Sequence, residues 1–164
     1  MPLCASTDRF RPGLVAADFV PTQWESAEQK AKFANALLRF IAADFPRSKF
    51  HEGFYRRLSN TFGHIAHYNR DQFYDHFFLS AEDKLAFLEQ CVTWPCYGDP
   101  TFTYSDVERA IGARLRKSQV LAILSSQIAV EHRRRELALL AELKARYEPA
   151  AEAPASAGIL DLFG

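Results

Sequence analysis

Cysteine is scarce in this sequence: the 164 residues contain only Cys4, Cys91 and Cys96. A small and odd number of cysteines excludes a disulfide scaffold and is typical of proteins from a reducing compartment. The first nine residues lack the basic stretch and apolar run of a signal peptide, and no run approaches the roughly 18 apolar residues that a membrane span needs. We therefore expect a cytoplasmic protein without a membrane-spanning segment.

The sequence also lacks an excess of charge of either sign, because 20 basic residues balance 20 acidic ones. A neutral chain has no overall field that attracts nucleic acid or an anionic membrane, so such binding requires a local basic patch. There is no glycine-rich phosphate loop, no Gly-x-Ser-x-Gly elbow and no His-Glu-x-x-His pair. Their absence removes support for the common enzyme classes that carry them, and we expect no cofactor.

Aromatic residues, in contrast, are abundant, with 14 Phe, 6 Tyr and 2 Trp. Each large aromatic side chain buries about 150–250 Å², so these residues are expected to dominate one core. Apolar positions recur every three or four residues, which is the period of amphipathic helices. The pattern predicts an all-α fold, with a compact bundle of five to seven helices over residues 23–148. An extended arm with three prolines precedes it over residues 1–22.

Residues that cap helix N-termini indicate where these helices begin. Capping-box patterns start at Ser26 and at Ser105, and Ser48, Asn69 and Ser80 are further N-cap candidates. The first helix should therefore start after Ser26, and the last third of the bundle after Ser105.

Other residues indicate where helices end. Pro46 should stop the first helix and Gly63 should interrupt the second, while a weak point is expected near Ser118. Beyond it the apolar pattern continues through Leu139 and Leu143. This periodicity predicts that the last helix also has an inner, packed face.

The composition changes after residue 148, where Ala, Pro and Glu predominate. Residues 149–158 are therefore predicted to form a flexible linker, followed by an apolar C-terminal peptide over residues 159–164. Apolar side chains at the end of a linker need a surface on which to bury, which is either the chain's own domain or a partner.

The segment Leu160-Asp161-Leu162-Phe163 resembles the end of the short peptide by which bacterial replication and repair proteins bind the DNA sliding clamp. The resemblance covers only these residues, with Ile159 in place of the glutamine that is common in that motif. It implies that Leu160, Leu162 and Phe163 fill a hydrophobic pocket of the clamp, and that the protein is of bacterial or mobile-element origin.

A second resemblance concerns Arg70 and His76, which are similar to the Arg-polar-spacer-His signature of HEPN ribonucleases. It implies a small helical bundle in which Arg70 stabilises phosphate charge while His76 transfers protons. Arg57 and His64 form a slightly longer version of the same pattern. The alternative is that Arg70 is a surface charge and that His76 borders an aromatic core.

A metal site is a further hypothesis. His64 and His67 would share one face of a helix, and Cys91 and Cys96 would complete a Cys₂His₂ set for zinc. The alternative is that Cys91 is a small buried apolar residue and that the histidines are hydrogen-bonded or exposed.

Local basic charge is concentrated at Arg133, Arg134 and Arg135, which makes contact with nucleic-acid phosphates a tentative prediction. Glu131 and Glu136 flank this triplet, so the alternative is a solvated helix face with ion pairs one turn apart.

These features favour a non-catalytic helical interaction module that engages a protein partner through its C-terminal peptide. A HEPN-like ribonuclease is the alternative function, and a helical domain with a structural zinc site is the third.

Overall fold

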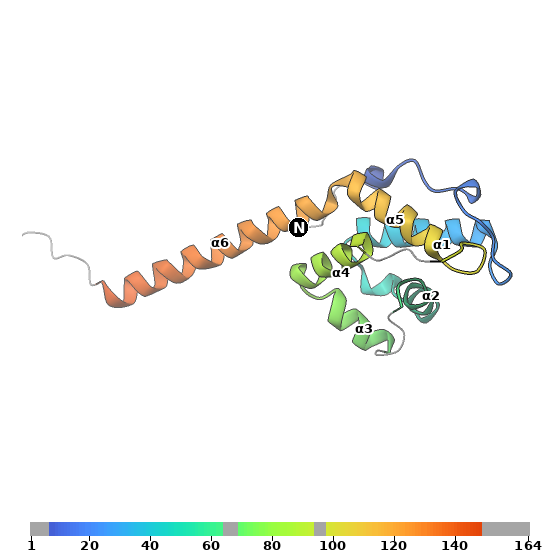
Figure 1. Ribbon diagram of the computed structural model, residues 1–164. Coiled ribbons are helices and arrows are strands. Elements are labelled where there is room, and N and C mark those ends of the chain that lie inside the picture. Colours follow the sequence, from blue (N-terminus) through green and yellow to red (C-terminus); the bar gives the residue numbers. More distant parts are fainter. Residues whose placement is uncertain (1–6, 64–68, 94–97, 149–164) are drawn as a thin grey trace, which may run out of the picture. The chain divides into compact units, whose positions relative to one another are not determined.

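The computed structural model describes residues 7–63, 69–93 and 98–148. All regular elements in these ranges are helical, as Figure 1 shows. The α-helices are α1 (Ala27–Ala42), α2 (Glu52–Phe62), α3 (Arg70–Phe77), α4 (Ala81–Thr93), α5 (Ser105–Ser118) and α6 (Val120–Tyr147). Three short 3₁₀ helices are η1 (Thr7–Phe10), η2 (Ala16–Asp18) and η3 (Arg47–Lys49). The predicted all-α fold is confirmed, and no helix in the described ranges has the length and apolar character to cross a membrane.

The chain divides into two units, residues 1–128 and residues 129–164. The first unit holds α1 to α5 and the first turns of α6, where Val120 and Leu124 are buried. The second unit begins within α6. The sequence pattern places the end of the helical domain later, at residue 148.

Three predicted N-caps are present. The side chains of Ser26 and Asn69 accept hydrogen bonds from the backbone N–H groups of Gln29 (3.2 Å) and Gln72 (2.8 Å), and both glutamines reach back to complete a capping box. The hydroxyl of Ser80 accepts the N–H of the third residue of α4 at 3.0 Å. These helix starts depend on neighbouring residues alone, which is why the sequence predicts them.

Two predicted N-caps are wrong. Ser48 lies in η3, and α2 is capped instead by His51, whose Nδ1 accepts the N–H of Phe54 at 3.2 Å. Ser105 is the first residue of α5, not its cap, and its hydroxyl donates to the carbonyl oxygen of Gly98 at 3.2 Å. The hydroxyl of Ser105 therefore binds a loop residue seven positions earlier, and it does not cap the helix.

Aromatic rings fill the core of the first unit, as predicted. The ring of Phe50 lies within 6.1 Å, centroid to centroid, of rings from α1, α2, α3 and the residue that follows α3. Phe78 stacks on Phe45 and forms an edge-to-face pair with Phe87 of α4, each at a centroid distance of 5.0 Å. Offset and edge-to-face pairs of this kind add about 0.5–1.5 kcal/mol each to the free energy of burial.

The turn after α1 is held by partners from two other helices. Asp44 and Phe45 both have positive φ, at 64° and 55°, a conformation that disfavours residues with a Cβ atom. Lys84 of α4 pairs with the Asp44 carboxylate at 2.9 Å. Tyr74 of α3 donates its hydroxyl to the carbonyl of Phe45 at 2.6 Å, and burial raises the pKa of this tyrosine. These contacts stabilise a turn that the local sequence disfavours.

The described part of the N-terminal arm packs on the bundle. Phe10, Leu14 and Phe19 are buried. Asn35 of α1 binds both backbone groups of Leu14, accepting its N–H at 2.9 Å and donating to its carbonyl at 2.7 Å. The arm is therefore part of the core of this unit, with η1 and η2 within it.

Candidate functional site

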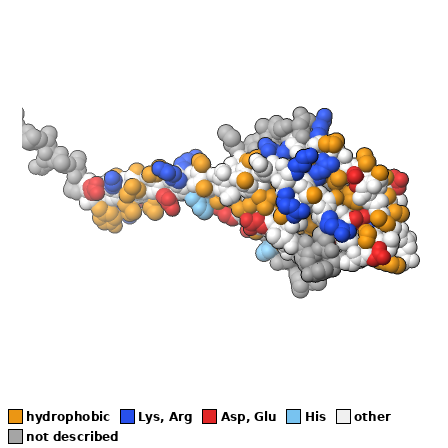
Figure 2. All heavy atoms as spheres, turned by 45° about the horizontal axis from the view of Figure 1, so that its top comes forward, with side chains coloured by type: hydrophobic (Ala, Val, Ile, Leu, Met, Phe, Trp, Pro, Cys, Tyr) orange, Lys and Arg blue, Asp and Glu red, His pale blue; other side chains and the backbone are white. Residues whose placement is uncertain are grey.

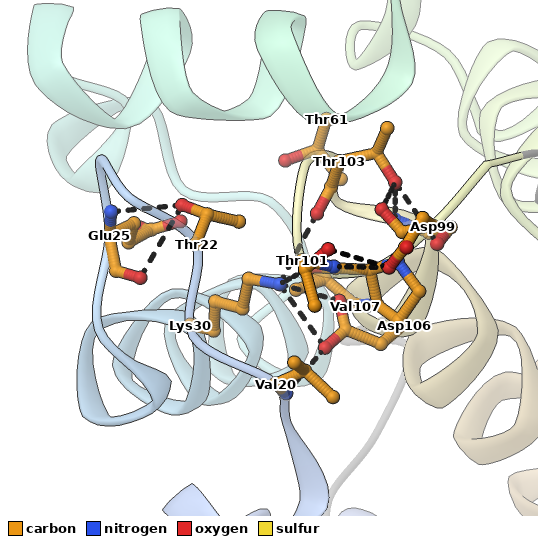
Figure 3. Close-up of polar contacts among 12 residues, drawn as sticks. Val20, Thr22, Glu25, Lys30, Thr61, Asp99, Thr101, Thr103, Asp106 and Val107 are labelled. Carbon is orange, nitrogen blue, oxygen red and sulfur yellow. Dashed lines mark hydrogen bonds and ion pairs between the residues drawn. The ribbon is translucent and has the colours of Figure 1, made fainter.

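A buried cation joins α1 to α5 and to the loop that precedes α5 (Figure 3). Lys30 has no exposed surface. Its Nζ donates to the carbonyls of Pro100 at 2.9 Å and Thr103 at 3.2 Å, and to the Asp106 carboxylate at 3.0 Å. The three N–H groups of the ammonium thus meet three acceptor groups, as a buried charge requires.

The Asp106 carboxylate has further partners around it. It accepts the backbone N–H groups of Val20 and Val107, each at 2.9 Å. Within the preceding loop, Asp99 accepts the N–H and hydroxyl of Thr101, and these bonds lower the pKa of Asp99. Lys30 is fully buried, the Asp106 side chain is only 10% exposed, and the pair is saturated with hydrogen bonds. Its chemistry is therefore that of a structural clamp between chain segments.

Arg57 forms a second such link. Its guanidinium binds the Glu25 carboxylate through two bonds of 2.9 and 2.7 Å. The same guanidinium lies between the rings of Phe33, at 4.3 Å, and Tyr104, at 4.0 Å. Arg57 therefore anchors α2 to the segment before α1 and to the start of α5. Its predicted companion, His64, lies outside the described residues.

Arg70 and His76 both lie in α3, but only Arg70 borders the cavity next to this helix. Arg70 borders a small cavity of about 290 Å³ together with Arg47 and His51, and His76 is not among its lining residues. The rings of His76 and Phe77 are perpendicular, with their centroids 4.5 Å apart. Six residues of helix separate Arg70 and His76 by about 120° around the axis. The structure thus brings Arg70 to His51 and leaves the ribonuclease hypothesis a prediction, which RNA cleavage by wild type against His76→Ala would test.

Of the four residues proposed for zinc, only Cys91 is described, since His64, His67 and Cys96 lie outside the described ranges. Cys91 is buried in α4, and burial, with a contribution from the charge of Glu108, raises the pKa of its thiol. A raised pKa disfavours the thiolate that a zinc site uses. Among described residues, no three His, Cys, Asp or Glu side chains lie together as a metal would need.

The arginine triplet lies on the exposed part of α6. Arg134 and Arg135 pair with the Glu131 carboxylate at 2.8 and 3.3 Å, while Arg133 is exposed. The hydrogen bond from Arg134 lowers the pKa of Glu131. Two of the three arginines therefore belong to ion pairs within their own helix.

A second basic surface lies on α5. Arg109, Arg116 and Lys117 are exposed there. Arg109 and Arg116 are seven residues apart, which places them on one face of the helix. Arg116 donates to the carbonyl of Val92 at 3.1 Å, and Arg114 donates to the carbonyl of Phe10 at 3.0 Å. Backbone carbonyls leave the guanidinium charges unneutralised. Figure 2 shows Lys and Arg side chains gathered on a face of this unit.

A cavity of about 960 Å³ lies between the arm, α1 and the segment that leads into α2. Its floor includes Phe40 and Phe54, and its charged lining residues are Arg11, Arg39 and Lys49. No Asp or Glu lines it. The sequence could not reveal this cavity, because its walls come from separate segments with no shared motif.

The C-terminal half of α6 carries an exposed apolar stripe, which corrects the prediction of a packed inner face. The exposed fractions are 55% for Leu137 and Leu139, 47% for Leu140, 40% for Leu143 and 71% for Tyr147. Periodicity identified the correct side chains, but it could not show whether another element covers them.

The predicted peptide with Leu160, Leu162 and Phe163 lies outside the described residues, as does the predicted linker 149–158.

Comparison with known proteins adds no assignment, because no family model, no curated protein and no solved structure matches the sequence.

Proposed function

We propose that this protein is a non-catalytic helical interaction module that engages a protein partner through its C-terminal peptide, with the DNA sliding clamp as the first candidate. The proposal is carried by one feature of the sequence. Four large apolar residues between Ile159 and Phe163 follow ten residues, 149–158, that contain none. The free energy of such a peptide falls when an apolar surface covers its side chains.

The folded part of the chain supports this proposal because its buried cations form structural contacts within the fold. The buried cation Lys30 and the largely buried Arg57 are consumed by acceptors that join chain segments. These groups stabilise the fold by joining segments that lie apart in the sequence. The residues before the linker also expose apolar side chains, among them Leu139 and Leu143. Exposed apolar surface is typical of protein-binding sites, so the C-terminal part of the chain is suited to binding a partner.

The test compares side-chain variants of the full chain. Binding to a purified bacterial sliding clamp is measured by titration calorimetry for wild type and for the Leu160→Ala/Leu162→Ala/Phe163→Ala variant. Loss of three buried apolar side chains should weaken binding by more than about 100-fold. Asp161→Ala is the matched control, because Asp161 lies between the positions that match the motif, and it should bind within about threefold of wild type.

Equal binding by the triple variant and wild type would contradict the proposal. A fall in the melting temperature of the triple variant would also contradict it, because the peptide would then be part of the fold. An unchanged melting temperature with lost binding is the expected result.

A second candidate function is binding to the phosphate backbone of nucleic acid by the exposed face of α5. The observation that favours it is that Arg109 and Lys117 are exposed and that Arg116 binds a carbonyl instead of a carboxylate. This surface suits phosphates better than Arg134 and Arg135, which already share Glu131.

Fluorescence anisotropy with labelled duplex DNA, measured at several salt concentrations, tests this second function. Arg109→Glu/Lys117→Glu should weaken binding and reduce the slope of log K against log salt by about 2, roughly one for each phosphate that is no longer neutralised. Lys32→Glu/Lys49→Glu makes the same change of charge elsewhere and should leave the slope unchanged. Equal effects of both variants would show a response to net charge alone.

A further inference from the structure

Three of the four exposed leucines of the stripe on α6, all but Leu139, are arranged symmetrically. Leu137 and Leu143 lie three residues on either side of Leu140, and Glu136 and Lys144 lie four residues on either side. Helix geometry places all five side chains on one side of α6. The stripe therefore has leucines at its centre and opposite charges at matched distances from it.

The same symmetry extends to the ends of the stripe, since Arg133 and Tyr147 lie seven residues on either side of Leu140. The stripe from Arg133 to Tyr147 is about 21 Å long at 1.5 Å per residue. Its side chains are exposed at every position from 132 to 148. A helix in water gains most of its stability from packing an apolar face, and this face has leucines that are 40–55% exposed.

We propose that this stripe binds a second copy of the same chain, with the two α6 helices antiparallel and related by a two-fold axis at Leu140. In this arrangement residues equally far from Leu140 lie at the same level. Leu137 of one copy then meets Leu143 of the other, and Leu140 meets its own counterpart. An isologous interface requires this kind of self-complementary surface.

Charge supports the antiparallel arrangement over the parallel one. Antiparallel pairing places Glu136 at the level of Lys144 of the second copy, and Arg133 at the level of the Tyr147 ring, where a cation–π contact can form. Parallel pairing would instead bring Lys144 to Lys144 and Arg133 to Arg133 between the helices. Neither Glu136 nor Lys144 has an ion pair with another described residue, whereas Glu142 and Arg146, on the opposite face, pair with each other at 2.9 Å.

Figure 2 shows hydrophobic side chains at the surface of α6. Contact along one short helix buries less area than the interface of a stable dimer. We therefore expect a dissociation constant on the order of 10–100 µM. Self-association must therefore be measured at protein concentrations from about 1 µM to 1 mM.

Sedimentation equilibrium of the full chain across this concentration range tests the proposal. Wild type should pass from monomer to dimer, and Leu140→Asp should remain monomeric, because two carboxylates would meet at the axis. Glu136→Lys should weaken the dimer by about five- to tenfold, and so should Lys144→Glu, since each creates like charges at two places in the dimer. The double variant Glu136→Lys/Lys144→Glu restores opposite charges and should recover wild-type association.

The matched control exchanges charges on the opposite face of the helix. Glu142→Lys/Arg146→Glu changes the same residue types and should leave association unchanged. Circular dichroism of each variant should show the helix content of wild type, which separates loss of pairing from loss of the helix.

Several results would overturn the proposal. One is a wild type that stays monomeric up to 1 mM, and another is a dimer that survives Leu140→Asp. A double charge exchange that fails to recover association would exclude the antiparallel arrangement. A chain without residues 159–164 should still dimerise, so loss of the dimer on that deletion would assign self-association to the peptide. The experiment is independent of the clamp, so its failure leaves the proposed function standing.

Discussion

Replacing Lys30 by methionine tests whether the buried clamp stabilises the fold as its geometry implies. Methionine keeps most of the length and apolar surface of lysine and removes the ammonium. The carbonyls of Pro100 and Thr103 then lose their donor, and the Asp106 carboxylate, whose side chain is only 10% exposed, loses its counter-charge. The question is how much free energy of unfolding these losses remove.

Removing one partner of a buried ion pair costs about 3–5 kcal/mol. The Asp106 carboxylate keeps two backbone N–H donors, at Val20 and Val107, and this reduces the penalty. We therefore expect Lys30→Met to lower the free energy of unfolding by about 2–4 kcal/mol. With an m-value of about 2 kcal/mol per molar urea, the unfolding midpoint should fall by about 1–2 M.

Arg56→Met is the control, because it removes a cation from an exposed pair. Arg56 and Glu52 are 69% and 52% exposed in their side chains, and a pair of this kind contributes less than about 0.5 kcal/mol. The double variant Lys30→Met/Asp106→Leu should lose less than the sum of the two single losses, by about 1–3 kcal/mol, since no unpaired charge remains.

Urea unfolding followed by far-UV circular dichroism measures these differences. A loss below about 1 kcal/mol for Lys30→Met, equal to that of Arg56→Met, would refute the reasoning. Strict additivity of the Lys30 and Asp106 variants would show that the two groups do not act as a pair.

Three further predictions concern single residues of the first unit. Tyr74→Phe removes the hydroxyl that binds the carbonyl of Phe45 and should cost about 1 kcal/mol in urea unfolding at neutral pH. Burial raises the pKa of Tyr74, so the neutral hydroxyl stabilises the fold below the ordinary pKa of 10.0, and this contribution is lost as pH rises above that value. The alkaline loss of stability should therefore be smaller in Tyr74→Phe. Burial also raises the pKa of the Cys91 thiol, so iodoacetamide at pH 8, followed by peptide mass mapping, should label Cys91 only in denaturant; rapid labelling of the folded chain would contradict its burial. Gln119 joins α5 to α6 with φ of 57°, so Gln119→Gly should raise the free energy of unfolding by about 0.5–1 kcal/mol, and a loss of stability would show that its side chain matters more than its backbone.

The features that the sequence predicted correctly depend on neighbouring residues. The capping box at Ser26 and the N-cap at Asn69 form because donor and acceptor lie three residues apart. Gly63 ends α2 in the left-handed conformation that glycine favours. The break near Ser118 is also present, with α5 ending there.

The features that the sequence did not predict depend on residues far apart in the chain. The burial of Lys30 depends on Asp106, 76 residues later, and an isolated lysine in an amphipathic helix is expected at the surface. Ser105 fits a capping box, but its hydroxyl binds the Gly98 carbonyl. Local patterns carry no information on such tertiary partners.

The candidate sites follow the same division. The spacing of Arg70 and His76 is visible in the sequence, but the cavity that Arg70 borders, without His76, depends on how α3 packs beside η3 and α2. The apolar period of α6 was visible too, and the exposure of Leu139 and Leu143 was not. A helical period identifies one face, whereas the presence of a covering element is a property of the whole fold.

The central claim is that the last six residues bind a protein partner without contributing to the fold. Affinity capture of a purified bacterial sliding clamp, with the full chain and with a chain that ends at Gly158, tests it most directly, together with the melting temperature of both chains. The account predicts that the full chain retains the clamp, that the shortened chain does not, and that both melt at the same temperature. Retention of the clamp by both chains, by neither chain, or a lower melting temperature of the shortened chain would contradict it.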